Sequence, residues 1–139
     1  MKRVSVLSLL LLSACSSATS PVNSLSGHWV ASFQVDTSGA PTSIWSGGLT
    51  QMGQSITGTV ICGASVAQYS VSGQIVQEPG ALGLNLTFIG VGNDTAHFFG
   101  TARDSANYGV IASGNFGDNA PGQCLSGTGH WFARQFVGP

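Results

Sequence analysis

The stretch LGLNLTF (residues 82–88) places an apolar side chain at every second position. Successive side chains of a β-strand point to opposite faces of the sheet, so a period of two predicts a strand with one buried face. The triplet EPG (78–80) precedes this stretch and is a clear turn signal, because Pro and Gly interrupt regular structure. The run before the triplet (66–77) is also β-prone, so residues 66–90 are predicted to form two strands joined by a tight turn.

Similar β-prone runs, separated by Gly, Pro, Asn, Asp or Ser, continue on both sides of this pair. Good helix formers are scarce, and each of the 20 glycines would weaken a helix interior by about 1 kcal/mol relative to Ala. The chain is therefore predicted to be all-β, with short loops and no helix. The eight expected strands are 28–35, 42–52, 56–62, 66–77, 82–90, 95–103, 108–116 and 124–136.

Nearly every expected strand carries or adjoins a glycine that follows a small or aromatic residue. These glycines are Gly27, Gly47, Gly58, Gly73, Gly100, Gly114 and Gly127. Glycine admits the sharp bends of a strongly coiled sheet, and closing such a sheet removes its exposed edges. We therefore predict that residues 27–139 form one domain, an eight-stranded antiparallel up-and-down barrel. A two-sheet β-sandwich is the alternative.

The N-terminus carries an export signal. The basic start (residues 1–3) is followed by nine mostly apolar residues, Val4–Leu12. A membrane-spanning helix needs about 20 residues, so this run fits the centre of a secretory signal instead. The next residues, Ser13-Ala14-Cys15, complete a Leu-Ser-Ala-Cys sequence.

This sequence resembles the lipobox of bacterial lipoproteins. The resemblance implies a signal peptide of residues 1–14 and a Cys15 that carries diacylglycerol and further fatty acyl groups such as palmitate. Two or more acyl chains anchor a protein stably in a membrane. We therefore expect an exported, lipid-anchored protein of the cell envelope, with Ser16 favouring the outer membrane if the host has two. An ordinary signal peptide with a chance cysteine is the alternative.

The segment between the anchor and the barrel (residues 15–26) is rich in Ser, contains Pro21 and has no periodicity, so it is predicted to be a flexible tether. Beyond residue 14 the chain has two arginines against five carboxylates. Nucleic-acid binding needs clustered Lys and Arg, so a nucleic-acid partner is not expected.

Two cysteines remain after Cys15 is assigned to the lipid. Cys62 and Cys124 form an even pair in an oxidising compartment, which predicts a disulfide. Closing the loop between them would stabilise the fold by about 4 kcal/mol in the chain-entropy model. Two free thiols or a metal-binding pair are the alternatives.

Gly27-His28-Trp29 near the start and Arg134 near the end resemble the calycins, the lipocalin and avidin-like barrels. The resemblance implies that Trp29 closes the base of the barrel and packs near Arg134, where a guanidinium over an indole gains a cation–π contact. The likeness to avidins extends to residues 53–59, 69–73 and 82–84. Ala31 and Val60 replace polar biotin-binding residues of the avidins, so biotin is not an expected ligand.

No catalytic or metal-binding arrangement stands out. His28 and His130 each precede a Trp on strands that would pair in a closed barrel, but aligning the strands by their centres leaves them roughly 10 Å apart. The five carboxylates all lie in turn contexts, where they cap turns. We therefore expect no metal, no cofactor and no enzymatic activity.

Aromatic residues are spread over nearly every expected strand. The interior of an eight-stranded barrel is either filled by side chains or holds one small ligand. If a ligand is bound, the expected lining residues are Trp45, Tyr69, Phe98 and Trp131. The first hypothesis for function is a non-catalytic binding module for a small apolar or amphipathic ligand. The second is an envelope protein-interaction or inhibitor barrel with a filled core.

Overall fold

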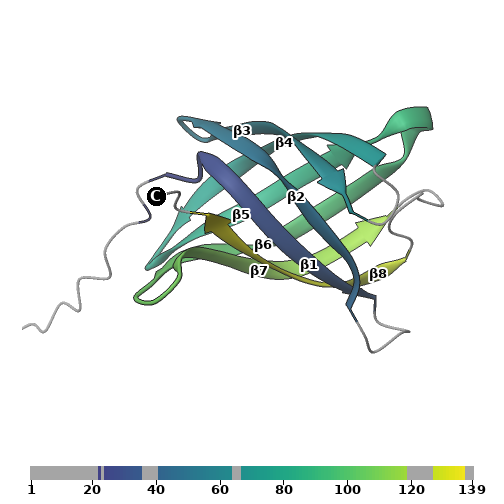
Figure 1. Ribbon diagram of the computed structural model, residues 1–139. Helices are drawn as coiled ribbons and strands as arrows, with labels where there is room; N and C mark the ends of the chain where they lie inside the picture. The colour runs from purple at the N-terminus through teal and green to yellow at the C-terminus, as the bar shows by residue number, and fades with distance from the viewer. Residues whose placement is uncertain (1–21, 23, 36–40, 64–66, 119–126, 137–139) are drawn as a thin grey trace, which may run out of the picture.

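Eight antiparallel strands form one sheet that closes on itself in the computed structural model (Figure 1). The structure describes residues 22, 24–35, 41–63, 67–118 and 127–136. The strands are β1 (Gly27–Val35), β2 (Pro41–Met52), β3 (Ser55–Cys62), β4 (Ala67–Glu78), β5 (Ala81–Ile89), β6 (Thr95–Ser105), β7 (Gly109–Asp118) and β8 (Thr128–Phe136).

Each strand pairs with the next along the chain, and β1 pairs with β8. Val30 of β1 lies opposite Arg134 of β8 on one side and Ser46 of β2 on the other. The all-β, eight-stranded, up-and-down barrel predicted from the sequence is therefore confirmed, and the sandwich is excluded. Between β5 and β6 the chain makes one short 3-10 turn, Val91–Asn93. None of the described residues belongs to a helix long and apolar enough to cross a membrane.

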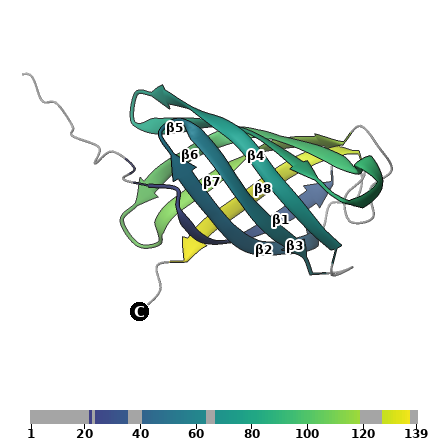
Figure 2. The ribbon, with the colours of Figure 1, turned by 90° about the horizontal axis from the view of Figure 1, so that it is seen from above.

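The barrel has two distinct ends. The start of β1, the end of β8 and the hairpins β2–β3, β4–β5 and β6–β7 lie at one end, which we call the N-terminal end (Figures 1 and 2). The connection between β5 and β6 lies at the opposite end, which we call the far end. Side chains alternate between the interior and the surface along each strand. In β8, for example, Trp131 and Ala133 are buried while Phe132 and Arg134 are exposed.

Six glycines of the strands lie where neighbouring strands approach closely. A Cβ atom added to any of them would lie between 1.8 and 2.3 Å from a backbone oxygen of the adjacent strand. No side chain fits at such a distance, so these positions allow the strands to coil tightly around a narrow interior. They are Gly47, Gly58, Gly73, Gly100, Gly114 and Gly129.

Replacing one of these glycines is expected to destabilise the barrel. In Gly114→Ala the new methyl group would lie 1.8 Å from the Phe99 carbonyl oxygen, so β6 and β7 must move apart. We expect a loss of about 3 kcal/mol or more in the free energy of unfolding, the upper range for overpacking. Urea denaturation measures this loss.

Gly48→Ala is the matched control, because a Cβ there meets no atom within 4 Å. Its effect should stay within about 0.5 kcal/mol, as for an ordinary surface substitution. Equal denaturation midpoints for the two variants would show that close strand approach does not require glycine.

Candidate functional site

The far half of the barrel is filled by aromatic rings. Trp45 lies at the centre of this packing, with ring centroids 5.1 Å from Phe33, 4.7 Å from Tyr69 and 5.2 Å from Phe88. Such spacings are in the range of favourable aromatic contacts. The aromatic cluster draws on every strand except β3 and consists of Phe33, Trp45, Tyr69, Phe88, Phe98, Phe116 and Trp131.

A buried carboxylate lies beside the aromatic cluster. The Tyr69 hydroxyl donates a hydrogen bond to Asp94 Oδ2, and both side chains are buried. Asp94 follows the 3-10 turn, and its backbone oxygen accepts a hydrogen bond from the Gly90 amide at 2.7 Å. A hydrogen bond to a charged group stabilises a fold more than a neutral one, so this contact fixes the β5–β6 connection against the far end.

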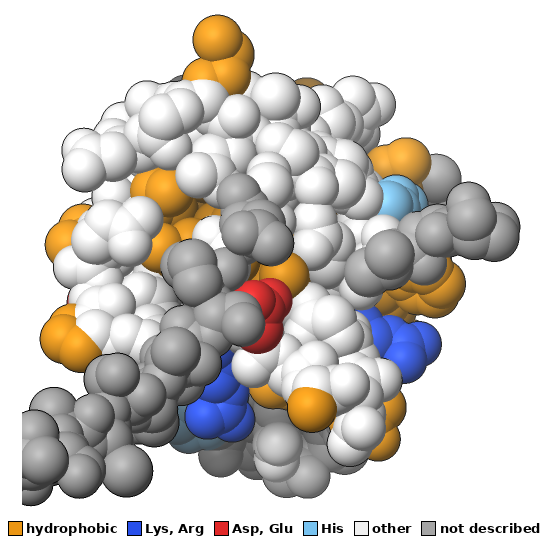
Figure 3. Space-filling view, turned by 90° about the vertical axis from the view of Figure 1, so that its left-hand side faces the viewer, with side chains coloured by type: hydrophobic (Ala, Val, Ile, Leu, Met, Phe, Trp, Pro, Cys, Tyr) orange, Lys and Arg blue, Asp and Glu red, His pale blue; other side chains and the backbone are white. Residues whose placement is uncertain are grey.

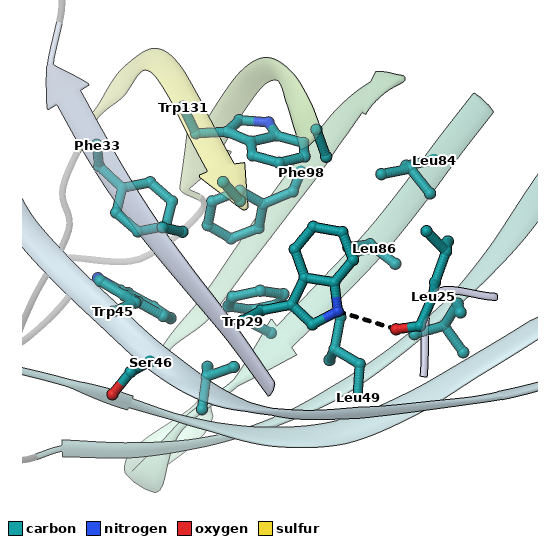
Figure 4. Close-up of a pocket in the computed structure, with 16 residues that line it drawn as sticks. Leu25, Trp29, Phe33, Trp45, Ser46, Leu49, Leu84, Leu86, Phe98 and Trp131 are labelled. Atoms are coloured by element: carbon teal, nitrogen blue, oxygen red, sulfur yellow. Dashed lines mark hydrogen bonds between the residues drawn. The ribbon is translucent and has the colours of Figure 1, made fainter. Parts of the chain in front are cut away.

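Small side chains occupy one side of the interior. Ala102, Ala112, Ala133 and Ala31 lie opposite one another in register across β6, β7, β8 and β1. Three of them, Ala31, Ala112 and Ala133, line a cavity of about 50 Å³ between the aromatic cluster and Leu25 (Figure 4). Sixteen of the described residues line this cavity, and all of these except Ser46 are hydrophobic.

Residues Ser24–Ser26, which we call the strap, lie across the cavity at the N-terminal end. The Leu25 side chain is only 2% exposed and lines the cavity. Its carbonyl oxygen accepts a hydrogen bond from Trp29 Nε1 at 2.9 Å (Figure 4). Figure 3 looks onto this end, where hydrophobic side chains are visible inside a hollow of the rim.

Side chains of the barrel rim hold the strap. The Leu25 backbone N–H donates a hydrogen bond to the side-chain oxygen Oε1 of Gln51 at 2.8 Å. The Gln51 backbone N–H donates in turn to Ser26 Oγ at 2.8 Å. On the other side of the rim, Gln135 Nε2 donates to the Ser26 carbonyl oxygen at 2.6 Å. The chain passes from the strap into β1 at Gly27, whose φ of 145° favours glycine.

The four predicted lining residues all lie in the interior. Trp45, Phe98 and Trp131 line the cavity, whereas Tyr69 packs behind Trp45 and binds Asp94. Three features of the site were not predicted: Leu25, the row of alanines and Asp94. A signal existed for the alanines, because each occupies an inward position in the period-two pattern.

The predicted contact between Trp29 and Arg134 is wrong. Trp29 is buried and lies at the N-terminal end as expected, but Arg134 is exposed on the outer face. Its guanidinium carbon lies 5.3 Å from the ring centroid of Phe136 instead. The reason is the strand alternation: Trp131 and Ala133 point inward, so Arg134 must point outward. At the N-terminal end of the barrel, Leu25 covers Trp29, and the chain enters β1 at Gly27.

The strap belongs to the segment that was predicted to be a flexible tether, and the described part of that segment packs on the barrel. Val22 and Leu25 pack against the hydrophobic core, although both fall within the residues 15–26 that were expected to be flexible. The Ser-rich composition concealed two apolar residues that have a place in the barrel. The predicted signal peptide (residues 1–14) and the predicted lipidation site, Cys15, lie outside the described residues.

Cys62 and the histidines lie at separate places in the described part of the barrel. Cys62 is fully buried, and its predicted partner Cys124 lies outside the described residues, so the disulfide stays a prediction. His28 lies opposite Phe136, and His130 lies opposite Gln34, six positions further along β1. Among the described residues no three His, Cys, Asp or Glu side chains are grouped so that they could hold a metal ion.

Comparisons of the chain with protein-family models, with curated proteins and with solved structures give no match. The likeness to the calycins therefore depends on the residues quoted above and on the closed eight-stranded barrel, which is consistent with a calycin-like fold.

Removing the Tyr69 hydroxyl tests the buried contact at the far end. Tyr69→Phe keeps the ring in the aromatic cluster but takes one hydrogen-bond donor from Asp94. We expect a loss of about 2 kcal/mol in the free energy of unfolding, as for hydrogen bonds to charged groups. Tyr108→Phe, on an exposed side chain, is the control and should change stability by less than about 0.5 kcal/mol. If both variants unfold at the same urea concentration, the Tyr69–Asp94 contact contributes nothing.

Proposed function

We propose that this protein is a lipid-anchored protein of the cell envelope whose barrel binds a small apolar ligand without chemical conversion. The observation that carries the proposal is the cavity between the aromatic cluster and Leu25. An apolar cavity favours hydrocarbon over water, because no lining group replaces the hydrogen bonds that water would lose.

The character of the lining supports binding rather than catalysis. General acid–base catalysis needs a titratable side chain within hydrogen-bond reach of the reacting group. The cavity is lined by aliphatic and aromatic side chains, and Ser46 is the one residue among them with a hydroxyl group. Such a surface can select a ligand by shape and apolar area, and it offers no base to activate a nucleophile.

The size of the cavity limits the ligand. An apolar cavity of about 150 Å³ binds benzene, whereas the cavity here measures about 50 Å³. Ordinary binding sites for drug-sized molecules measure about 300–1,000 Å³. The proposed ligand is therefore small, and a molecule of the size of benzene would need more room than the barrel provides with the strap in place.

The predicted anchor would place the cavity close to the membrane. Cys15 precedes Leu25 by ten residues, which span at most about 35 Å when extended. Since the strap enters the barrel at the N-terminal end, an acylated Cys15 would hold that end toward the bilayer. Apolar molecules partition into bilayers, so this orientation would bring the cavity to its ligand.

Exposed phenylalanines support a second candidate function, an envelope protein that binds a protein partner through its outer face. Phe99 on β6 and Phe132 and Phe136 on β8 are each about half exposed. Phe99 and Phe132 lie on the two strands that flank β7, and exposed apolar side chains that gather on one face often mark interaction sites. In this case the interior would serve only as a filled core.

The anchor is tested by replacing its cysteine. We expect the wild-type protein, expressed in a bacterial host with its own signal, to fractionate with membranes and to carry the mass of added acyl groups. Cys15→Ser should lose both properties, because the hydroxyl cannot take the thioether-linked lipid. Mass spectrometry and fractionation measure this, with Cys62→Ser as a matched control that should keep the lipid. An unmodified wild-type chain would contradict the anchor.

The ligand is tested by native mass spectrometry of protein purified from membranes. We expect an extra mass that is lost on denaturation. It should be absent from Ala112→Leu, because the larger side chain fills the cavity. Ala106→Leu, at an exposed turn position, should keep the mass, and circular dichroism confirms that both variants fold. A wild-type mass that does not change on denaturation would favour the second candidate and a protein partner on the outer face.

A further inference from the structure

We propose that the strap is a displaceable stopper, and that the ligand enters at the N-terminal end by replacing Leu25. The ligand assigned by this geometry is a small apolar molecule with one carbonyl-type hydrogen-bond acceptor. This inference rests on the proposed function, since it names the route and chemistry of the same cavity. In the alternative, a rigid cavity, Leu25 would be a permanent part of the wall and no ligand would replace it.

The contacts that hold the strap are suited to exchange. Gln51 and Gln135 bind it through exposed or half-buried groups at the rim. When the strap leaves, water can reach these groups and replace the lost hydrogen bonds, so their net contribution to closure is modest. The main interaction that resists opening is the burial of the Leu25 side chain. A ligand that buries equal apolar area compensates for that loss.

Displacing the Leu25 side chain would enlarge the cavity toward the size of a small ligand. With the strap in place the cavity measures about 50 Å³. The volume of a four-carbon side chain would be added to it, which brings it toward the roughly 150 Å³ that holds a benzene-sized molecule. Leu84 and Leu86 of β5 and the alanines of β7 and β8 already line the enlarged space. No strand has to move, because the strap lies outside the β-ladder.

Trp29 defines the polar requirement of the ligand. Its indole N–H is buried and donates to the Leu25 carbonyl oxygen at 2.9 Å. If the strap leaves, this donor loses its acceptor inside an apolar site, which is costly unless the ligand supplies another. A site built around a buried donor rejects an analogue that lacks the acceptor. A ketone, ester or amide oxygen at the position of the Leu25 carbonyl would meet this requirement.

The experiment titrates the full-length protein in lipid nanodiscs with cyclopentanone and with methylenecyclopentane, which has C=CH₂ in place of C=O. Probe concentrations are corrected for partition into empty nanodiscs. The readout is the indole N–H resonance of Trp29 in ¹H–¹⁵N spectra. Each titration is repeated with Leu25→Ala, which removes the stopper side chain, and with Leu82→Ala, a buried leucine that does not line the cavity.

In the wild type we expect cyclopentanone to shift the Trp29 resonance and to bind about tenfold more tightly than methylenecyclopentane. In Leu25→Ala both probes should bind about tenfold more tightly than in the wild type, because the probe no longer competes with a leucine. The preference for the ketone should also fall below about threefold there, since the carbonyl of residue 25 still occupies Trp29. Leu82→Ala should behave like the wild type.

Two results would overturn the proposal in distinguishable ways. If cyclopentanone binds all three proteins with equal affinity and leaves the Trp29 resonance unchanged, the stopper is wrong while ligand binding stands. If neither probe binds any of the three proteins, the cavity is not a ligand site. The proposed function and the proposed stopper then both fail.

Discussion

The pairing of β1 with β8 is the constraint on which the rest of the structure depends. This pairing joins the first and last strands along their length and leaves the sheet without an edge. The interior of an eight-stranded barrel is just wide enough for side chains or one small ligand. Glycines in the wall, such as Gly100 opposite Gly114, bring neighbouring strands closer still. Every inward side chain must therefore share a small and fixed volume.

That volume is divided unequally along the barrel axis. Large rings, with Trp45 among them, fill the far half, and four alanines in register leave space in the other half. Leu25, which lies outside the sheet, covers this space at the N-terminal end. Its carbonyl oxygen also accepts the hydrogen bond of the buried Trp29 N–H. In our proposal the capacity of the barrel for a ligand thus depends on the strap, a segment outside the β-ladder. Ligand binding and closure by Leu25 would then be alternative uses of one position.

Periodicity and turn chemistry were sufficient to predict the strands and the barrel, because each strand has one buried face and short loops leave only antiparallel neighbours. The same alternation of inward and outward side chains places Arg134 on the outside, next to the inward Ala133. The predicted contact of Arg134 with Trp29 came from the likeness to the calycins and conflicts with this alternation. Leu25 carries no periodic signal in a Ser-rich segment. Asp94 meets Tyr69 across 25 residues, a contact that only the closed barrel creates. The cavity volume is a small difference between large packed volumes, so no single residue encodes it.

Diffraction from crystals under xenon pressure tests the central claim most directly, because xenon occupies apolar cavities without requiring a specific ligand. The account predicts one interior xenon site between the aromatic cluster and Leu25, in contact with Trp29 and Leu86. Its occupancy should rise in a Leu25→Ala crystal. An interior without xenon in both proteins would show that the barrel is filled throughout, and the function would then have to be sought on its outer face.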